Sequence, residues 1–376
     1  TVMEEFESPI VIDNGSITCK AGFAGDDKLR CEVPCLVGQP GHTGVMVGMG
    51  HLHAYVGQEA IGKQGTSYHF NCPIQRGIVT NWTEMEKVWH HVFYNELRVE
   101  PERHHVLITD APSNPMVNRE KMTEIMFESF NVPGIHITLE AMLSLYAVDI
   151  TTGIALYSGD GLTYTIPVYE GFVLKKGIQR LEMAGSDITD NLMKSLNQRG
   201  YTFLNAAERL TIRNMKESVC YVSQDIEHES ATYNDQTKKS YILPDGREIF
   251  AQNERYLSPE GLFLPSMFGL DCPGIQKLLH NSILKCPVDT RRDFYSNLVL
   301  SGGSTLFPGL PERLEKEMTA LAPAGIHVKI VAPPDRKYCV WVGGSIMASL
   351  SSFPKTCVQK QEYEETGPSI VHRKFM

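Results

Sequence analysis

Two glycine-rich turns, each carrying an aspartate, contain the residues of this sequence best suited to chemistry. Residues 13–16 (Asp-Asn-Gly-Ser) follow the apolar run 9–12, and residues 158–161 (Ser-Gly-Asp-Gly) follow the apolar run 153–156. Asn-Gly and Asp-Gly are preferred in tight hairpin turns. Glycine allows close approach of the backbone to a ligand, and successive free N–H groups form an anion site. The two turns therefore predict a pair of hairpins that hold a polyphosphate and its metal ion from opposite sides.

Length and composition limit the class of protein. A chain of 376 residues exceeds one ordinary core, so we expect two domains. Hydrophobic residues at 42% and charged residues at 21% are typical of a globular protein. The net charge of −9 argues against non-specific nucleic-acid binding, and the longest apolar runs are too short to span a membrane. Nine scattered cysteines and an acidic N-terminus indicate reduced thiols in the cytosol or nucleus.

The order of the expected elements places these turns in an α/β fold. Short strands are expected within 8–38 and at 106–109 and 297–300, and the polar, glycine-rich stretch 40–66 reads as a surface loop. Helices are expected near 83–97, 118–130, 139–149, 187–199, 205–223, 274–285, 309–321 and 341–350, the first from the capping-box pattern Thr83-x-x-Glu86. The pattern restarts near residue 153. Two similar α/β halves predict a ligand between them.

Longer runs of the sequence resemble the actin family, and the resemblance covers essentially the whole chain. The runs that carry it are 11–16, 20–27, 44–50, 93–99, 168–171 and 367–374. The resemblance implies a two-domain actin-like ATPase fold, with duplicated ribonuclease-H-like domains around a nucleotide cleft. It assigns residues 1–140 and 341–376 to a small outer domain, which includes a mobile loop at 40–53, and residues 141–340 to a large inner domain.

The same resemblance implies the residues of the site. The nucleotide-binding residues would be Gly15, Ser16, Ile17, Lys20, Gly159, Asp160, Gly161, Arg213, Lys216, Glu217, Gly303, Ser304, Leu306, Phe307 and Lys337. Mg²⁺ or Ca²⁺ would be bound beside ATP or ADP by Asp13, directly or through water, together with Glu140. Residues 40–53 match the loop that inserts into the next subunit, and residues 266–274 match the apolar plug between the strands of a filament.

Departures from the family gather in the expected catalytic pocket, for which the resemblance singles out Glu140, Asp160 and Tyr164. Seven residues of this chain replace the residue that actins carry: Ile17 replaces Gly, Arg76 replaces His, Glu140 replaces Gln, Tyr157 replaces Asp, Tyr164 replaces His, Cys357 replaces Trp and Phe375 replaces Cys. Hydrolysis needs an in-line water and neutralised charge on the transferring phosphoryl group. We therefore expect ATP to bind and to be hydrolysed slowly or not at all, at most as by a slow actin-type ATPase. Whether Glu140 replaces the missing aspartate at the metal ion stays open at this point.

Three classes of function are compatible with this reading. The first is an ATP-binding cytoskeletal protein of the cytoplasm that forms or joins filaments with itself, other actin-fold subunits and actin-binding proteins. The second is an actin-related subunit of a larger assembly, such as an axonemal dynein arm, the sperm cytoskeleton or a nuclear chromatin complex, with ATP as structural cofactor. The third, a sugar kinase or chaperone-type ATPase, is disfavoured because 376 residues leave no room for an added substrate domain. No direct nucleic-acid or membrane partner is expected.

Overall fold

The structure is a computed structural model that describes residues 6–40, 54–63, 68–203, 206–232 and 238–375. The chain forms two compact units, Thr1–Asp149 with Tyr338–Met376 and Ile150–Lys337. The sequence placed these boundaries after residues 140 and 340. In the structure α4 (Glu140–Tyr146) packs on α12 (Cys339–Ala348), which is why residues 141–149 and 338–340 group with the first unit.

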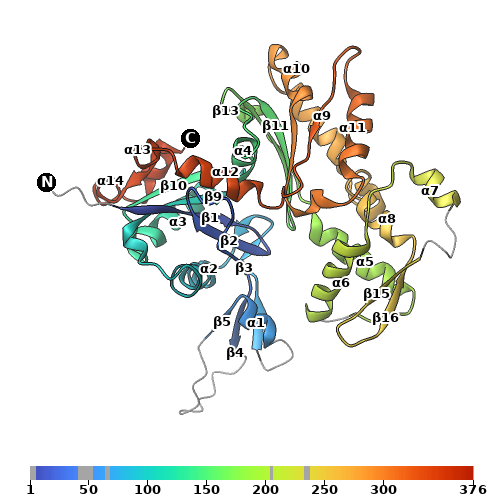
Figure 1. Cartoon of the computed structure of the whole chain (residues 1–376), viewed down its shortest axis with the longest axis horizontal. Coiled ribbons are helices and arrows are strands. Elements are labelled where there is room, and N and C mark those ends of the chain that lie inside the picture. Colours follow the sequence, from blue (N-terminus) through green and yellow to red (C-terminus); the bar gives the residue numbers. More distant parts are fainter. Residues whose placement is uncertain (1–5, 41–53, 64–67, 204–205, 233–237, 376) are drawn as a thin grey trace. The chain divides into compact units, whose positions relative to one another are not determined.

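The first unit is built on a six-stranded sheet of order β19-β10-β9-β1-β2-β3 (Figure 1). Its strands are β1 (Glu7–Asn14), β2 (Thr18–Phe23), β3 (Cys31–Pro34), β9 (His104–Asp110), β10 (Gly134–Leu139) and β19 (Val358–Gln359). β1, β9 and β10 are parallel, and the other pairs are antiparallel. β9 is buried along its whole length, as expected of a parallel strand covered on both faces.

Helices cover both faces of this sheet. Its helices are α2 (Trp82–His90), which continues as the π-helix η1 (His91–Leu97), α3 (Met116–Glu128), α4, α12, α13 (Phe353–Thr356), α14 (Lys360–Thr366), α15 (Val371–Lys374), η2 (Pro101–Arg103) and η7 (Pro368–Ile370). α2 begins before the predicted capping box, because the Asn81 side chain accepts a hydrogen bond from the Glu84 N–H. Gly343 lets α12 approach α4 closely, since a Cβ there would lie 1.8 Å from the Leu143 carbonyl oxygen.

A small three-stranded sheet and two short hairpin strands complete the first unit. They are β4 (Val37–Pro40), β5 (Tyr55–Val56), β6 (Tyr68–Asn71), β7 (Ile74–Gln75) and β8 (Ile78–Val79), with the short helix α1 (Gln58–Gly62). The prediction of one loop over 40–66 is therefore wrong for β5 and α1. Residues 41–53 and 64–67 lie outside the described residues, so the structure does not address the expected subunit-contact loop.

The second unit repeats the sheet of the first. Its main sheet has the order β13-β12-β11-β17-β18, and β14 also pairs with β12. The strands are β11 (Gly153–Ser158), β12 (Thr163–Tyr169), β13 (Phe172–Val173), β14 (Gln179–Leu181), β17 (Leu298–Ser301) and β18 (Ile330–Val331), with a separate hairpin of β15 (Lys239–Ile242) and β16 (Glu248–Ala251). β11 pairs antiparallel with β12 and parallel with β17, as β1 does with β2 and β9. The prediction of two similar α/β halves is confirmed.

The helices of the second unit pack around a core formed by residues from all parts of residues 150–337. They are α5 (Gly185–Gln198), α6 (Ala206–Val219), α7 (Ile226–Thr232), α8 (Glu254–Glu260), α9 (Ile275–Leu284), α10 (Val288–Ser296), α11 (Leu310–Leu321), η3 (Lys175–Gly177), η5 (Pro265–Phe268) and η6 (Gly303–Leu306). α7, α8 and α10 are additions to the sequence prediction. Among the described helices of the chain, none combines the length and the apolar character needed to cross a membrane.

Candidate nucleotide site

The two glycine-rich turns form hairpins of the same length. Asn14 pairs with Cys19 across the first turn, and Ser158 pairs with Thr163 across the second. Each turn closes with the same bond: the Gly15 N–H donates to the Thr18 carbonyl at 3.1 Å, and the Gly159 N–H donates to the Leu162 carbonyl at 3.0 Å. The predicted hairpins are confirmed, and they occupy corresponding positions in the two sheets.

Both turns present backbone N–H groups to their surroundings. Within the described part of the chain, no acceptor is bonded to the N–H groups of Ser16 and Ile17 in the first turn. The same is true of Asp160 and Gly161 in the second turn. Successive unbonded N–H groups in a tight turn attract an anion such as phosphate. Each turn is therefore suited, within its own unit, to an anion.

A buried ion pair lies directly beside the first turn. Lys20 Nζ donates to Asp13 Oδ2 at 2.7 Å, and Thr109 Oγ1 donates to Asp13 Oδ1 at 3.1 Å. Burial disfavours the charge on Lys20, but Asp13 and then Glu140 outweigh this effect and raise the Lys20 pKa. Lys20 is therefore held as a cation in a buried ion pair with Asp13, the first residue of the turn.

Thr109 and Trp89 hold the first turn in place, and sequence reasoning missed both. The Asn14 N–H donates to Thr109 Oγ1 at 2.9 Å, and Trp89 Nε1 donates to Asn14 Oδ1 at 3.0 Å. Asn14 is buried, and its Nδ2 has no hydrogen-bond partner in the described residues. An unpaired buried amide donor is costly unless a ligand or water accepts from it. Because Nδ2 is enclosed by the protein, this unpaired donor is a cost to the fold.

Ser16 and Ile17 connect the first turn to its neighbours. Ser16 Oγ accepts from the Gly77 N–H at 3.3 Å, and the Ile17 carbonyl accepts from the Cys35 N–H at 2.7 Å. Gly15 is needed at its position, because a Cβ there would lie 2.8 Å from the Thr18 carbonyl oxygen. With Ile17 in place of glycine, the turn still forms its closing hydrogen bond.

The second turn is anchored on the first turn of α5. The Gly159 carbonyl accepts from Ser304 Oγ at 2.6 Å and from the Gly185 N–H at 3.1 Å. The Asp160 carbonyl accepts from the Ser186 N–H at 2.8 Å, and Lys216 Nζ donates to the Gly185 carbonyl at 2.8 Å. The structure thus brings predicted residues from three separate parts of the sequence, Gly159–Gly161, Lys216 and Ser304, together around one turn. Gly185 also belongs to this group, although it was not predicted from the sequence.

Burial makes the charges of this second cluster costly without a ligand. Burial raises the Asp160 pKa, and Lys216 and Arg213 oppose that rise. Burial also lowers the Lys216 pKa, against the opposing effect of Asp160. A bound polyphosphate would stabilise the Lys216 ammonium, because an opposite charge nearby favours the charged form. Arg213 donates to Glu217 at 3.3 Å on the more exposed face of α6.

The residues after β17 form the remaining wall of the cluster. A Cβ on Gly303 would meet no other atom within 4 Å, so η6 begins with an open side. Leu306 is exposed and Lys337 is half-buried, and both are compatible with a ligand contact. Phe307 instead belongs to the hydrophobic core of the second unit. The structure brings Gly303 and Ser304 to the second turn and leaves Phe307 as a packing residue behind them.

Two tyrosines stand at the positions where the resemblance implies Asp and His. Tyr157 and Tyr164 are opposite each other on β11 and β12, and their rings stack with centroids 4.9 Å apart and planes at 23°. Tyr164 is fully buried, while Tyr157 is half-buried at the end of its strand. Neither ring offers the carboxylate or the imidazole that the resemblance implies at these positions.

The nucleotide and its metal ion can be tested separately against these residues. The unbonded N–H groups of each turn fit an anion such as phosphate, with Lys20 close to the first turn and Lys216 close to the second. Carboxylate oxygens are the ligands that Mg²⁺ and Ca²⁺ prefer, and Mg²⁺ often needs only one or two of them plus substrate phosphates. Asp13 and Glu140, which both act on the charge of Lys20, would be the carboxylates available for this role in the first unit. Among the described residues, no group of three or more His, Cys, Asp or Glu could hold a metal ion without the phosphates.

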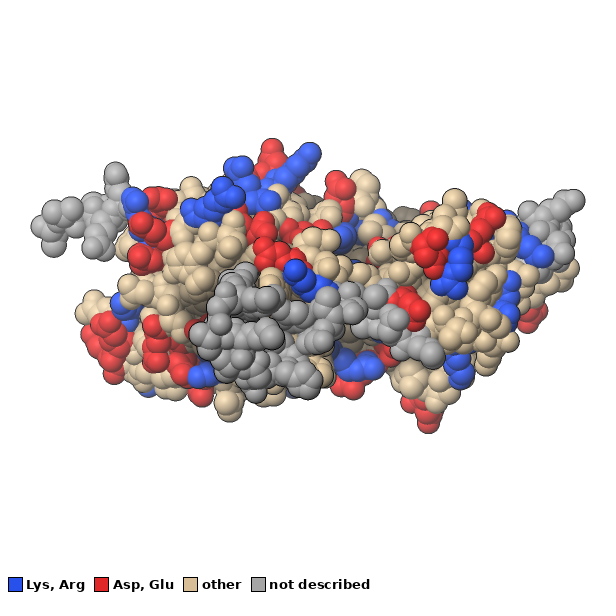
Figure 2. Space-filling view, turned by 90° about the horizontal axis from the view of Figure 1, so that it is seen from below, with Lys and Arg blue, Asp and Glu red and all other residues tan. Residues whose placement is uncertain are grey.

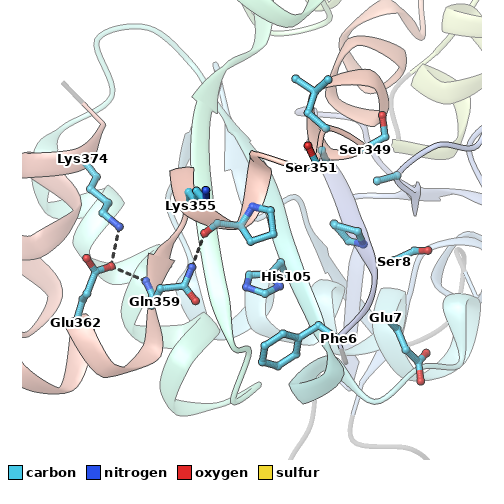
Figure 3. A pocket seen from close by; sticks show the side chains of 15 residues that line it. Phe6, Glu7, Ser8, His105, Ser349, Ser351, Lys355, Gln359, Glu362 and Lys374 are labelled. Atoms are coloured by element: carbon cyan, nitrogen blue, oxygen red, sulfur yellow. Dashed lines mark hydrogen bonds and ion pairs between the residues drawn. The ribbon is translucent and has the colours of Figure 1, made fainter. Parts of the chain in front are cut away.

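A cavity of about 880 Å³ lies elsewhere in the first unit and shares none of these residues. Figure 3 shows Phe6 against His105 within it, and Lys374 bonded to Glu362 at 2.7 Å on one side. On the face shown in Figure 2, acidic and basic side chains are interspersed. Neither feature matches a polyphosphate as well as the two turns do.

A repeated mixed sheet with a repeated glycine hairpin defines a duplicated two-unit α/β protein. The family model named Actin matches residues 4–376, nearly the whole chain. The chain therefore belongs to the actin family. Proteins of this family generally bind nucleotide and divalent cations, interact with actin-fold subunits and are typically cytoskeletal.

Proposed function

We propose that this chain is an ATP-binding cytoskeletal member of the actin family that forms or joins filaments and hydrolyses ATP slowly. The observation that carries the proposal is the pair of equal hairpins, each with unbonded N–H groups and a buried lysine close by. Buried lysines are rare unless they are paired or bind a ligand. Lys20 is paired with Asp13 and Lys216 donates to the Gly185 carbonyl, so each turn has a buried cation close by that supports phosphate binding.

The proposed roles follow from the contacts of each residue. The N–H groups of both turns and Lys20 bind phosphate oxygens, while Lys216 fixes the second turn through Gly185. A divalent cation carried by the nucleotide would supply charge neutralisation beside Asp13 and Glu140. Arg213, Glu217, Leu306 and Lys337 remain proposed contacts to the adenosine.

Slow hydrolysis is proposed because the polar groups that would position water differ from those of the family. The Tyr157–Tyr164 stack places aromatic carbon where a carboxylate and an imidazole would stand. Glu140, which stands where the resemblance implies Gln, is a buried carboxyl group that acts electrostatically on Lys20. A misplaced or absent water removes much of the rate enhancement of a hydrolytic site.

Nucleotide binding is tested by thermal unfolding of the purified chain. A ligand that binds only the folded state raises the melting temperature as its concentration exceeds the dissociation constant. We expect saturating ATP with Mg²⁺ to raise the melting temperature, and Lys20→Met to reduce the rise. An unchanged melting temperature, together with the absence of co-purified nucleotide, would show that the chain does not bind ATP.

Assembly is supported by an exposed apolar surface around η5. Leu264, Met267 and Leu270 are exposed, whereas Phe268 packs over Gly261. Exposed apolar groups that adjoin one another are typical of contact surfaces. This segment includes the residues that match the filament plug of the family, and it supports contact with another actin-fold subunit.

The sequence of the expected subunit-contact loop gives the test of assembly. Val47 and Met49 lie outside the described residues, but they are apolar residues in a polar, glycine-rich stretch. We expect glutamate at both positions to abolish co-sedimentation with filaments while the ATP-induced rise in melting temperature is kept. Unchanged co-sedimentation would exclude this loop as the contact.

The alternative is a fixed subunit of a larger assembly that keeps ATP as a structural cofactor. The altered pocket, with Tyr157 stacked on Tyr164, favours it, because a structural nucleotide needs no positioned water. Sedimentation of the pure chain, alone and with conventional actin, separates the two functions. If the chain pellets alone or together with conventional actin, the filament proposal is supported. If it stays in the supernatant in both samples, the alternative is supported.

A further inference from the structure

The cavity of about 880 Å³ is formed by residues of the first unit alone, and part of its lining is apolar. The Phe6 ring is exposed and meets the His105 ring edge-on, with centroids 4.8 Å apart (Figure 3). Pro9, Ala348 and Leu350 add aliphatic surface to the same cavity. A cavity of this volume with aromatic and aliphatic lining is typical of sites for small organic ligands.

The charged side chains of the cavity leave one cation to pair. Lys374 Nζ donates to Glu362 at 2.7 Å, and Arg103, outside the cavity, donates to Glu7 at 2.7 Å. Lys355 is exposed, and within the described part of the chain no hydrogen bond or ion pair joins its ammonium to another residue. The two carboxylates of the lining are therefore compensated, whereas the Lys355 charge is not.

The other polar groups of the lining are uncharged near pH 7. Burial lowers the His105 pKa, although a hydrogen bond with Gln359 opposes this effect, so the imidazole is neutral there. Ser8 and Ser351, labelled in Figure 3, are exposed hydroxyl groups, and each can donate one hydrogen bond to an anion. The lining thus matches a ligand with one negative charge and few further polar atoms.

We propose that this cavity binds a small amphipathic anion, with its single carboxylate paired with Lys355 and its apolar body over Phe6 and Leu350. The carboxylate supplies the charge that Lys355 lacks, and the apolar body covers side chains that are otherwise exposed to water. A phosphate dianion fits less well, because its second charge would stand uncompensated beside Glu7 and Glu362. The site shares no residue with the two glycine-rich turns, so it does not depend on nucleotide binding.

The test compares cinnamate, an aromatic carboxylate, with its neutral analogue cinnamamide by ligand-observed NMR titration of the full chain. We expect both probes to bind saturably, and cinnamate to bind about fivefold more tightly, since an exposed ion pair contributes modestly. Lys355→Gln should lower the affinity for cinnamate by about fivefold and leave that for cinnamamide unchanged. Phe6→Ala should lower both affinities by about tenfold, because the ring contacts the part that the two probes share.

Two matched variants outside the cavity serve as controls. Lys87→Gln removes a cation from α2, and Phe172→Ala removes an exposed ring from the second unit. Both should bind the two probes as the wild type does, and melting temperatures without ligand establish that every variant is folded.

Three results would overturn the inference. The first is a wild type that binds neither probe or binds both equally. The second is an affinity for cinnamate that Lys355→Gln or Phe6→Ala leaves unchanged. The third is binding of a short peptide, with one glutamate among leucines, to a chain that binds neither probe, which would assign the cavity to a protein partner instead.

Discussion

Replacing Gly185 with alanine should uncouple the second turn from its support. The new Cβ would lie 2.5 Å from Ser304 Oγ, 3.1 Å from the Gly159 carbonyl oxygen and 3.3 Å from Lys216 Nζ. Ser304 Oγ must then move by about an ångström to regain a normal contact distance. Its 2.6 Å hydrogen bond to Gly159 would not survive that movement.

The expected magnitude combines two opposing effects. Alanine favours a helix over glycine by up to about 1 kcal/mol, although less at the first helical residue. Loss of the Ser304 bond costs about 1 kcal/mol, and displacement of a turn that binds the ligand adds to this cost. We expect ATP affinity to fall by about tenfold, which corresponds to about 1.4 kcal/mol.

A double-mutant cycle isolates the proposed clash. In a Ser304→Ala background the obstructing hydroxyl is gone, so Gly185→Ala should have a smaller effect, with a coupling free energy of about 1 kcal/mol. Gly62→Ala in α1 is the control, because its Cβ would also meet nothing within 4 Å and Gly62 is not among the proposed site residues. ATP affinities from titration calorimetry give all four corners of the cycle. If Gly185→Ala weakens binding no more than Gly62→Ala, or if Ser304→Ala leaves its effect unchanged, the reasoning is refuted.

Two further predictions concern hydrolysis and acid stability. Phosphate release under filament-forming conditions should be at least about tenfold faster in the triple variant Glu140→Gln, Tyr157→Asp and Tyr164→His, because groups that act as a unit must be restored together. A triple variant as slow as the wild type would contradict this prediction. Burial lowers the His136 pKa to about 4, so the folded chain binds fewer protons than the unfolded chain below pH 6.5. Up to about 3 kcal/mol of the free energy of unfolding should be lost as the pH falls towards 4. Urea unfolding at pH 7 and at pH 4.5 measures this loss, and most of it should be absent in His136→Gln. An equal loss in the wild type and the variant would contradict the prediction.

The parts of the site that are local in sequence could be predicted from it. The Asn14-Gly15 and Gly159–Gly161 turns carry their own signal, because turn chemistry depends on adjacent residues. Helices with a strong periodicity of apolar residues, such as α2, α5 and α11, could also be predicted from the sequence. The match of both halves to one topology followed from the repeat of strand, turn and strand.

The supports of the site could not be predicted in the same way. Thr109 reaches the first turn across 95 residues of sequence and Trp89 across 75, and neither has a local signal. Gly185 reads only as a glycine before a helix. α8 contains Pro259, which normally argues against a helix interior, and tertiary contacts with α5 compensate for it. Such residues are specified by packing that only the folded chain shows.

The nucleotide retained by the freshly purified chain tests the central claim most directly. The protein is denatured, and the released nucleotide is separated and quantified by chromatography against the protein concentration. A chain that binds ATP and hydrolyses it slowly should release close to one nucleotide per chain, mostly as ATP. Release of no nucleotide would contradict the proposed binding of ATP, and release of ADP alone would contradict slow hydrolysis.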